Sequence, residues 1–166
     1  MTVPKFSVSQ ITSMTWPFER DVAAISQAGV PAIGISLGKL RTVGIDAAER
    51  MCREAGLEVS ALTTAGNFSY VDAALQRQQV EEVKRLIADV SRLSPGCLMI
   101  SSGNDPTLCW EEADPKFRRI LDELLPVAQA KNVGVMVRTP LARGLLTGKF
   151  APGQPLSSRI GRPTKP

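Results

Sequence analysis

The sequence predicts an α/β fold with about five parallel β-strands alternating with four α-helices. Strand-like and helix-like segments alternate along the chain from residue 6 to about residue 139. The helix-to-strand junctions QAGVPAI (27–33) and EAGLEVS (54–60) are of the same type, each with a glycine that ends a helix and a β-rich run after it. Since consecutive strands joined by helices run parallel, this repeat predicts a parallel sheet wound in one direction.

The first two strands are predicted over residues 6–12 (FSVSQIT) and 32–37 (AIGISL). Pro17 starts the helix between them, because proline suits the first turn of a helix. Apolar residues then recur at helical spacing until Gly29. This first unit therefore has the order strand, helix, strand.

The middle of the chain repeats the same alternation. A helix is predicted between Gly44 and Gly56, followed by a strand over residues 58–64 (EVSALTT). A longer helix is predicted over residues 72–93, followed by a strand over residues 97–101 (CLMIS). The strands of this part end in short polar segments closed by glycine, and in parallel α/β folds such exits form the ligand-binding edge.

The last helix is predicted to start at the pair Asp114 and Pro115, an N-cap followed by a first-turn proline. The fifth strand follows in GVMVRT (134–139). We expect residues 1–150 to form a single domain and residues 151–166 to form a flexible basic tail.

Composition excludes several classes of function. The 166 residues carry a formal net charge of +4, and residues 149–166 contain basic residues but no acidic ones. The body of the chain mixes both signs, which disfavours nucleic-acid binding. No apolar run approaches the roughly 18 residues of a membrane span, and the N-terminus has no signal-peptide pattern, so a soluble cytoplasmic protein is expected. Three cysteines without a CxxC spacing are interpreted as reduced thiols.

Three stretches carry a resemblance: FSVSQITSMTWPFERDVAAISQAGVPAIGIS, AAERMCREAGLEVSAL and LDELLPVAQAKNVGV. They resemble the xylose isomerase-like TIM-barrel family of sugar phosphate isomerases and epimerases, over about residues 6–137. The family closes eight strands into a barrel, and this chain has sequence for about five. The resemblance therefore implies a partial TIM barrel, an isomerase or epimerase activity in carbohydrate metabolism, and a sugar or sugar phosphate as the small-molecule partner.

The resemblance also implies a divalent metal held by Glu, Asp and His ligands, which polarises the sugar carbonyl. The family places its first ligand, a glutamate, at the end of the fifth strand, where this chain has Arg138. The chain contains no histidine, and among the acidic residues only Asp105 falls in a predicted exit loop. We therefore predict no metal site and no assignable catalytic residue, which leaves the activity of this chain open.

A second resemblance is local. VRTPLARGLLTGKFAPG (137–153) is similar to the aldo/keto reductase segment that helps to hold the phosphates of NADP. The resemblance begins at about residue 134 and implies cofactor contacts at Thr139, Leu141 and Arg143. The alternative function is thus a non-catalytic phosphate- or NADP-binding fragment of a reductase-like protein.

Arg138, together with Lys39, Arg41 and Arg143 at other predicted strand exits, leaves two interpretations open: an anion pocket for a phosphate, or solvated loop charges without a role. Short polar side chains at the strand exits are candidates for hydrogen bonds to sugar hydroxyls. With Arg138, the predicted substrate-binding residues are Ser9, Gln10, Asn67, Ser101 and Ser102. Finally, the unpaired edges of the first and fifth strands predict self-association.

Overall fold

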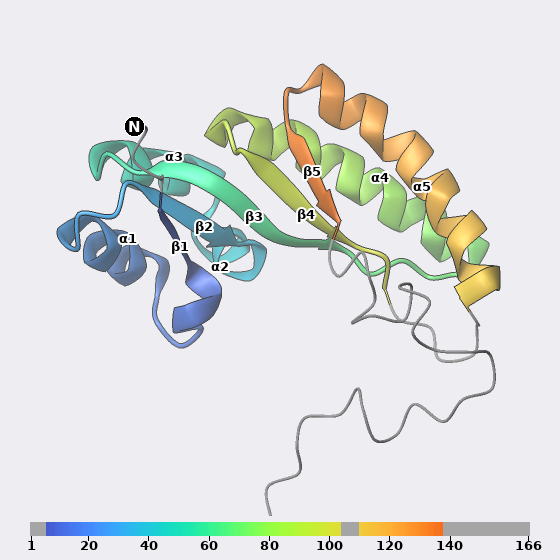
Figure 1. Cartoon of the computed structure of the whole chain (residues 1–166), viewed down its shortest axis with the longest axis horizontal. Helices are drawn as coiled ribbons and strands as arrows, with labels where there is room; N and C mark the ends of the chain where they lie inside the picture. The colour runs from blue at the N-terminus through green and yellow to red at the C-terminus, as the bar shows by residue number, and fades with distance from the viewer. Residues whose placement is uncertain (1–5, 104–109, 138–166) are drawn as a thin grey trace, which may run out of the picture. The chain divides into compact units, whose positions relative to one another are not determined.

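The computed structural model describes residues 6–103 and 110–137, and within them it confirms the parallel α/β architecture (Figure 1). The strands are β1 (Ser7–Ser9), β2 (Ala32–Ser36), β3 (Glu58–Gly66), β4 (Cys97–Ser101) and β5 (Gly134–Val137). The α-helices are α1 (Phe18–Gln27), α2 (Leu37–Val43), α3 (Ile45–Glu54), α4 (Ala73–Val90) and α5 (Trp110–Ala130). Two short 3-10 helices, η1 (Gln10–Ser13) and η2 (Ser91–Leu93), follow β1 and α4.

The five strands form one sheet in the order β1-β2-β3-β4-β5, which is the order of the sequence. The pairs β1–β2, β2–β3 and β3–β4 are all parallel, with Ser9 opposite Gly34 and Gly66 opposite Ser101. The carboxyl ends of the strands therefore meet along one edge, called the carboxyl edge below. Among the described residues, the strand exits predicted as candidate sites lie at this edge or just beyond it.

The hydrophobic core lies between the sheet and its helices. Ile33, Ile35, Leu62, Leu98 and Ile100 are fully buried and pack with helix residues in one cluster. In β4 the residues alternate between this core and partly exposed positions, as expected for a strand covered on one face. Figure 1 shows the helices on one side of the sheet, with α4 and α5 side by side. The other face of the sheet is the one that would line the interior of a closed barrel.

The prediction of four α-helices was wrong by one, because the segment after β2 is helix α2 rather than a loop. Leu37 and Leu40 stand three positions apart, and both are buried in the core. Gly44, with φ +79°, separates α2 from α3, a conformation that glycine adopts without steric cost. Lys39 and Arg41, expected in a loop, thus project from a short helix.

The first strand is shorter than the predicted residues 6–12. The Oγ of Ser9 accepts a hydrogen bond from the backbone N–H of Ile11 (3.3 Å), and Thr12 Oγ1 donates to the backbone oxygen of Ser9 (2.7 Å). These local bonds turn the chain into η1 immediately after Ser9. A strand of three residues remains.

The start of the last helix was also predicted wrongly. α5 begins at Trp110, so Pro115 lies within the helix instead of in its first turn. The Asp114 carboxylate does not serve as an N-cap; its Oδ2 accepts a hydrogen bond from Nε of Arg118 at 2.7 Å, one helical turn further on.

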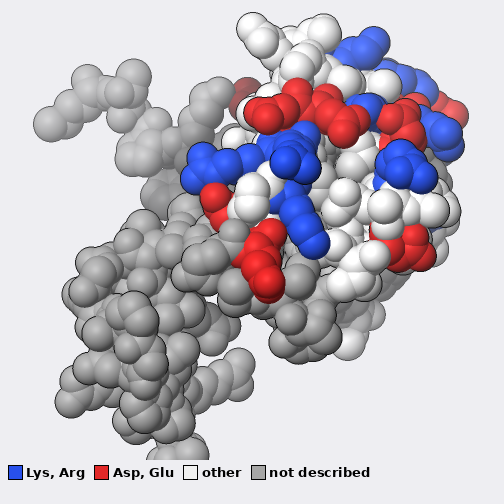
Figure 2. Space-filling view, turned by 90° about the vertical axis from the view of Figure 1, so that its right-hand side faces the viewer, with Lys and Arg blue, Asp and Glu red and all other residues white. Residues whose placement is uncertain are grey.

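The surface formed by α4 and α5 mixes both signs of charge (Figure 2). Lys84 of α4 contacts Glu81 on its own helix and Glu123 on α5, both at 2.8 Å. Positive and negative side chains therefore interleave on this surface. Within the described residues, no helix is both long enough and apolar enough to cross a membrane.

Candidate functional site

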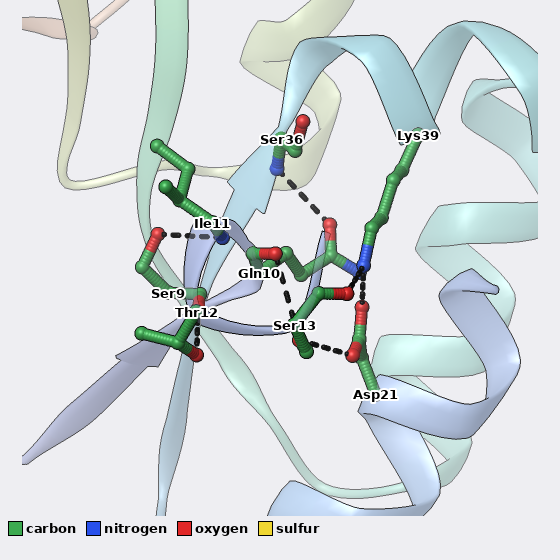
Figure 3. Close-up of polar contacts among 8 residues, drawn as sticks. All are labelled: Ser9, Gln10, Ile11, Thr12, Ser13, Asp21, Ser36 and Lys39. Atoms are coloured by element: carbon green, nitrogen blue, oxygen red, sulfur yellow. Dashed lines mark hydrogen bonds and ion pairs between the residues drawn. The ribbon is translucent and has the colours of Figure 1, made fainter. Parts of the chain in front are cut away.

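A network of polar side chains lies where β1 and β2 end (Figure 3). It joins η1, α1 and α2, three elements that surround the first two strand exits. Within the described residues, this is where the structure brings together a buried carboxylate, a cation and a buried amide.

The centre of the network is an ion pair between Lys39 of α2 and Asp21 of α1, with Nζ and Oδ2 2.5 Å apart. The Asp21 side chain is 1 % exposed and that of Lys39 is 11 % exposed. Ser13 completes the arrangement, since its Oγ donates to Oδ1 of Asp21 (2.6 Å) and its backbone oxygen accepts from Nζ of Lys39 (2.8 Å). Each charge is thus compensated and hydrogen-bonded, as burial requires.

Asp21 was not among the predicted site residues, because it lies in a predicted helix and not in a predicted exit loop. A signal was available: Asp21 lies three residues after Phe18 and four before Ile25, two buried residues of α1. That spacing puts Asp21 on the apolar face of the helix. A charge on such a face needs a partner, although its spacing does not identify Lys39.

Gln10, a predicted substrate-binding residue, is completely buried. Its Oε1 accepts a hydrogen bond from the backbone N–H of Ser36 (3.0 Å), which ties η1 to the end of β2. Its Nε2 has no hydrogen-bond partner among the described residues. In this structure the Gln10 side chain therefore joins η1 to the end of β2 inside the protein, and it is not open to solvent.

The other predicted sugar-binding residues fall into two groups. Ser9 lies at the end of β1, whereas Asn67, Ser101 and Ser102 lie together at the exits of β3 and β4. The backbone N–H of Asn67 donates to the backbone oxygen of Ser101 at 3.2 Å, which holds the second group in place. With β3 two strands and β4 three strands away from β1, Ser9 is separated from the second group by about 10 to 14 Å across the sheet.

Tyr70 reinforces the second group. Its hydroxyl donates to the backbone oxygen of Ser102 at 2.5 Å, and burial raises the pKa of Tyr70 to about 12. The phenol therefore remains protonated at neutral pH and acts as a donor. This contact fixes the turn that carries Ser102, a role that the sequence analysis did not assign to Tyr70.

Neither cysteine in the described residues has the environment of a nucleophile. Burial raises the pKa of the Cys52 thiol to about 11 and also raises the pKa of Cys97. Both are free thiols. Raised pKa values keep these two thiols protonated, in agreement with their interpretation as reduced thiols, whereas Cys109 lies outside the described residues.

The predicted anion pocket is only partly covered by the structure. Lys39 is neutralised by Asp21, so it does not offer an unpaired charge to a phosphate. Arg41 is exposed and lines a hollow of about 220 Å³ beside Asn67, Gln79 and Glu82. The remaining members, Arg138 and Arg143, lie outside the described residues, as do Thr139, Leu141 and Asp105. Their roles stay predictions.

Solved structures with the same fold include sugar epimerases. A protein of Sinorhizobium meliloti, SMc04130, matches with a TM-score of 0.74 and 21% identity over 82% of this chain and 50% of its own. The IOLI protein, solved with a binding zinc atom, matches at 0.70 and 15% identity over 81% and 51% of the two chains. D-psicose 3-epimerase of Clostridium cellulolyticum H10, solved with D-tagatose, matches at 0.67 and 13% identity over 80% and 51%.

Further matches are described as a xylose isomerase domain containing protein and a xylose isomerase domain protein, so the predicted structural resemblance is confirmed. The chain spans about half the length of the structures that it matches. No protein-family model and no curated protein sequence matches it. At these identities the likeness shows the fold: about half of a xylose isomerase-like TIM barrel.

Proposed function

We propose that this chain contributes to sugar or sugar phosphate binding in a protein of the isomerase and epimerase type. The proposal is supported most by one observation, the position of Ser9, Asn67 and Ser101 at the carboxyl edge of a xylose isomerase-like sheet. In barrels of this kind, ligands bind beyond the carboxyl ends of the strands. Hydroxyl and amide groups at that edge suit the hydroxyls of a sugar.

Asn67 is the strongest individual candidate. It is exposed, and its side-chain amide makes no hydrogen bond to any described residue, so both the donor and the acceptor remain available. Its backbone is held by two hydrogen bonds, from its own N–H to Ser101 and from Nε2 of Gln79 to its oxygen (3.1 Å). An available amide on a fixed backbone is suited to orienting a sugar hydroxyl.

A divalent metal, implied by the fold and by the zinc of the IOLI structure, does not fit the described residues. They contain no group of three or more His, Cys, Asp and Glu side chains that could hold a metal ion. Asp21, the buried carboxylate beside the first strand exits, is already engaged by Lys39 and Ser13. The proposed role is therefore binding, and no bond-making step is assigned to these residues.

The proposal is tested by titrating the 166-residue chain with D-fructose, D-tagatose and their phosphates, followed by NMR or calorimetry. The substitution Asn67→Gly removes the amide but keeps the left-handed backbone, since Asn67 has φ +81°. The loss of one hydrogen bond should weaken sugar binding by about 2- to 10-fold. The variant Ser91→Ala, changed in η2 before β4, should bind like the parent. If the parent chain binds none of these sugars, the proposal is wrong.

The second candidate, phosphate or NADP binding through Arg138 and Arg143, stays a prediction because both residues lie outside the described residues. A charge-assisted hydrogen bond predicts a tenfold to hundredfold loss of phosphate affinity, of the order of 1.5 to 3 kcal/mol, in the variant Arg138→Gln. If that variant binds phosphorylated sugars and NADP as the parent does, the proposed phosphate contact of Arg138 is wrong, and only the proposed contacts to sugar hydroxyls remain.

A further inference from the structure

The loop between β3 and α4, residues 67–72, leaves the carboxyl edge with Asn67 at its start. Gly66 and Asn67 have φ values of +93° and +81°, so the backbone passes through the left-handed region at both residues. Asparagine tolerates this region less readily than glycine does. The direction in which the Asn67 side chain leaves the backbone therefore depends on what holds the peptide groups on either side of it.

Two half-buried glutamines of α4 hold this loop. Gln76 and Gln79 stand three positions apart and so lie on the same face of the helix. Oε1 of Gln79 accepts a hydrogen bond from the backbone N–H of Ser69 (2.7 Å), and Nε2 of Gln79 donates to the backbone oxygen of Asn67 (3.1 Å). Nε2 of Gln76 donates to the backbone oxygen of Ser69 (2.6 Å). Both backbone groups of Ser69 are thus bonded to α4.

Gln79 has the more direct effect on Asn67. The backbone N–H of Asn67 donates to the backbone oxygen of Ser101 at 3.2 Å, and its C=O accepts from Gln79. Because each peptide group is planar, holding the two groups that flank the Asn67 Cα also sets the direction of its Cα–Cβ bond. Among the described residues, the Gln76 amide bonds to Ser69 and not to Asn67.

The chemistry of these two contacts requires an amide. One end of the Gln79 side chain accepts a hydrogen bond and the other end donates one. An ionised carboxylate can accept from the Ser69 N–H but has no proton for the Asn67 oxygen, whereas a protonated carboxyl group can do both. A glutamate at position 79 would therefore hold the loop only in its protonated form.

We infer that Gln79 is a positioning residue for the sugar site: it holds Asn67 so that the free amide of Asn67 can bond to a sugar hydroxyl. The inference rests on the proposed function, in which Asn67 binds the sugar. Since Gln79 acts through Asn67, the largest effect of losing Gln79 equals the loss of the Asn67 contact, about 2- to 10-fold in sugar affinity.

The test is the variant Gln79→Glu, titrated with D-fructose and D-tagatose, which carry no titrating group of their own in this pH range. At pH 7 the variant should bind the sugars about 2- to 10-fold more weakly than the parent, with an unchanged circular dichroism spectrum. Affinity should recover as the pH falls to about 4, where most glutamate side chains carry a proton. Arg41 and Glu82 line the same hollow as Gln79, so the parent is measured at each pH as well.

Two further variants show whether the effect passes through Asn67. The control Gln78→Glu introduces the same charge one position earlier, where the amide bonds to Glu82 (2.9 Å) instead of the loop, and it should bind sugars like the parent at each pH. The double variant Gln79→Glu with Asn67→Gly should bind no more weakly at pH 7 than Asn67→Gly alone, because the contact that Gln79 supports is already absent.

NMR without sugar reads the loop separately from binding. In Gln79→Glu the backbone N–H signals of Asn67 and Ser69 should move with the titration of the new carboxyl group, and signals that ignore it would refute the positioning role. If the parent binds sugar and Gln79→Glu binds equally well at pH 7, or if the double variant binds more weakly than Asn67→Gly, the inference is wrong and the proposed function stands. A parent chain that binds no sugar refutes the proposed function itself.

Discussion

Breaking the Asp21–Lys39 ion pair should destabilise the fold far more than breaking an ion pair on the surface. In the variant Lys39→Met, Asp21 keeps the hydrogen bond from Ser13 but stays buried without a counter-charge. At the 2.5 Å separation of Nζ and Oδ2, the attraction is about 6 to 7 kcal/mol for an effective dielectric constant of about 20. The cost of desolvating both groups offsets part of this, so the net loss should be about 3 to 5 kcal/mol.

The assay is urea unfolding at pH 7, followed by circular dichroism, of the parent, Lys39→Met, Asp21→Asn and the double variant. Because the double variant buries no unpaired charge, it should be more stable than the sum of the two single losses predicts, by a coupling energy of up to about 3 kcal/mol. The slope of the unfolding free energy with urea should not change, since the same surface is exposed on unfolding.

The matched control is the ion pair of Arg118 and Asp114 on α5, whose side chains are 73 % and 27 % exposed. There the variant Arg118→Met should cost less than about 1 kcal/mol, because water screens the pair. If Lys39→Met costs no more than this control, or if the cycle shows no coupling, the Asp21–Lys39 pair does not stabilise the strand exits and the reasoning fails.

Two further predictions concern single positions. Burial raises the pKa of Cys52 from 9.0 to about 11, so the native state holds this proton more tightly than the unfolded state does. The free energy of unfolding is therefore unaffected by this thiol below about pH 9 and falls by up to about 1.4 kcal/mol per pH unit as the pH rises towards 11. In the variant Cys52→Ala the urea midpoint should decline less steeply over this pH range. An unchanged decline would refute the raised pKa of Cys52. At Gly66, with φ +93°, an added Cβ would lie 2.2 Å from the backbone oxygen of Ser101. Gly66→Ala should therefore cost about 2 kcal/mol or more in thermal unfolding, whereas Gly29→Ala, at φ +69° with open space, should cost about 1 kcal/mol; equal losses would show that the contact with Ser101 relaxes.

The alternation of strands and helices could be predicted from the sequence because it depends on local patterns. Apolar periodicity and the glycines that end helices act within a few residues, and they located all five strands. Predictions failed where a local contact competed with the pattern. Leu37 and Leu40 made a helix of a predicted loop, and Ser9 ended the first strand early by bonding to the backbone of Ile11.

The candidate site, like the fold, could be predicted only in part from the sequence. The sequence by itself determined that Asn67 and Ser101 lie at the ends of strands, and a parallel sheet then places them at one edge; that β1 ends at Ser9 was decided by the structure. Only the tertiary structure decided that Gln10 is buried against Ser36, or that Asp21 and Lys39 form a pair. These partners lie 26 and 18 residues apart on different elements, and no local pattern encodes such a contact. The packing of α1 and α2 around the first two strands brings them together, because a charge buried by that packing is stable only beside its counter-charge.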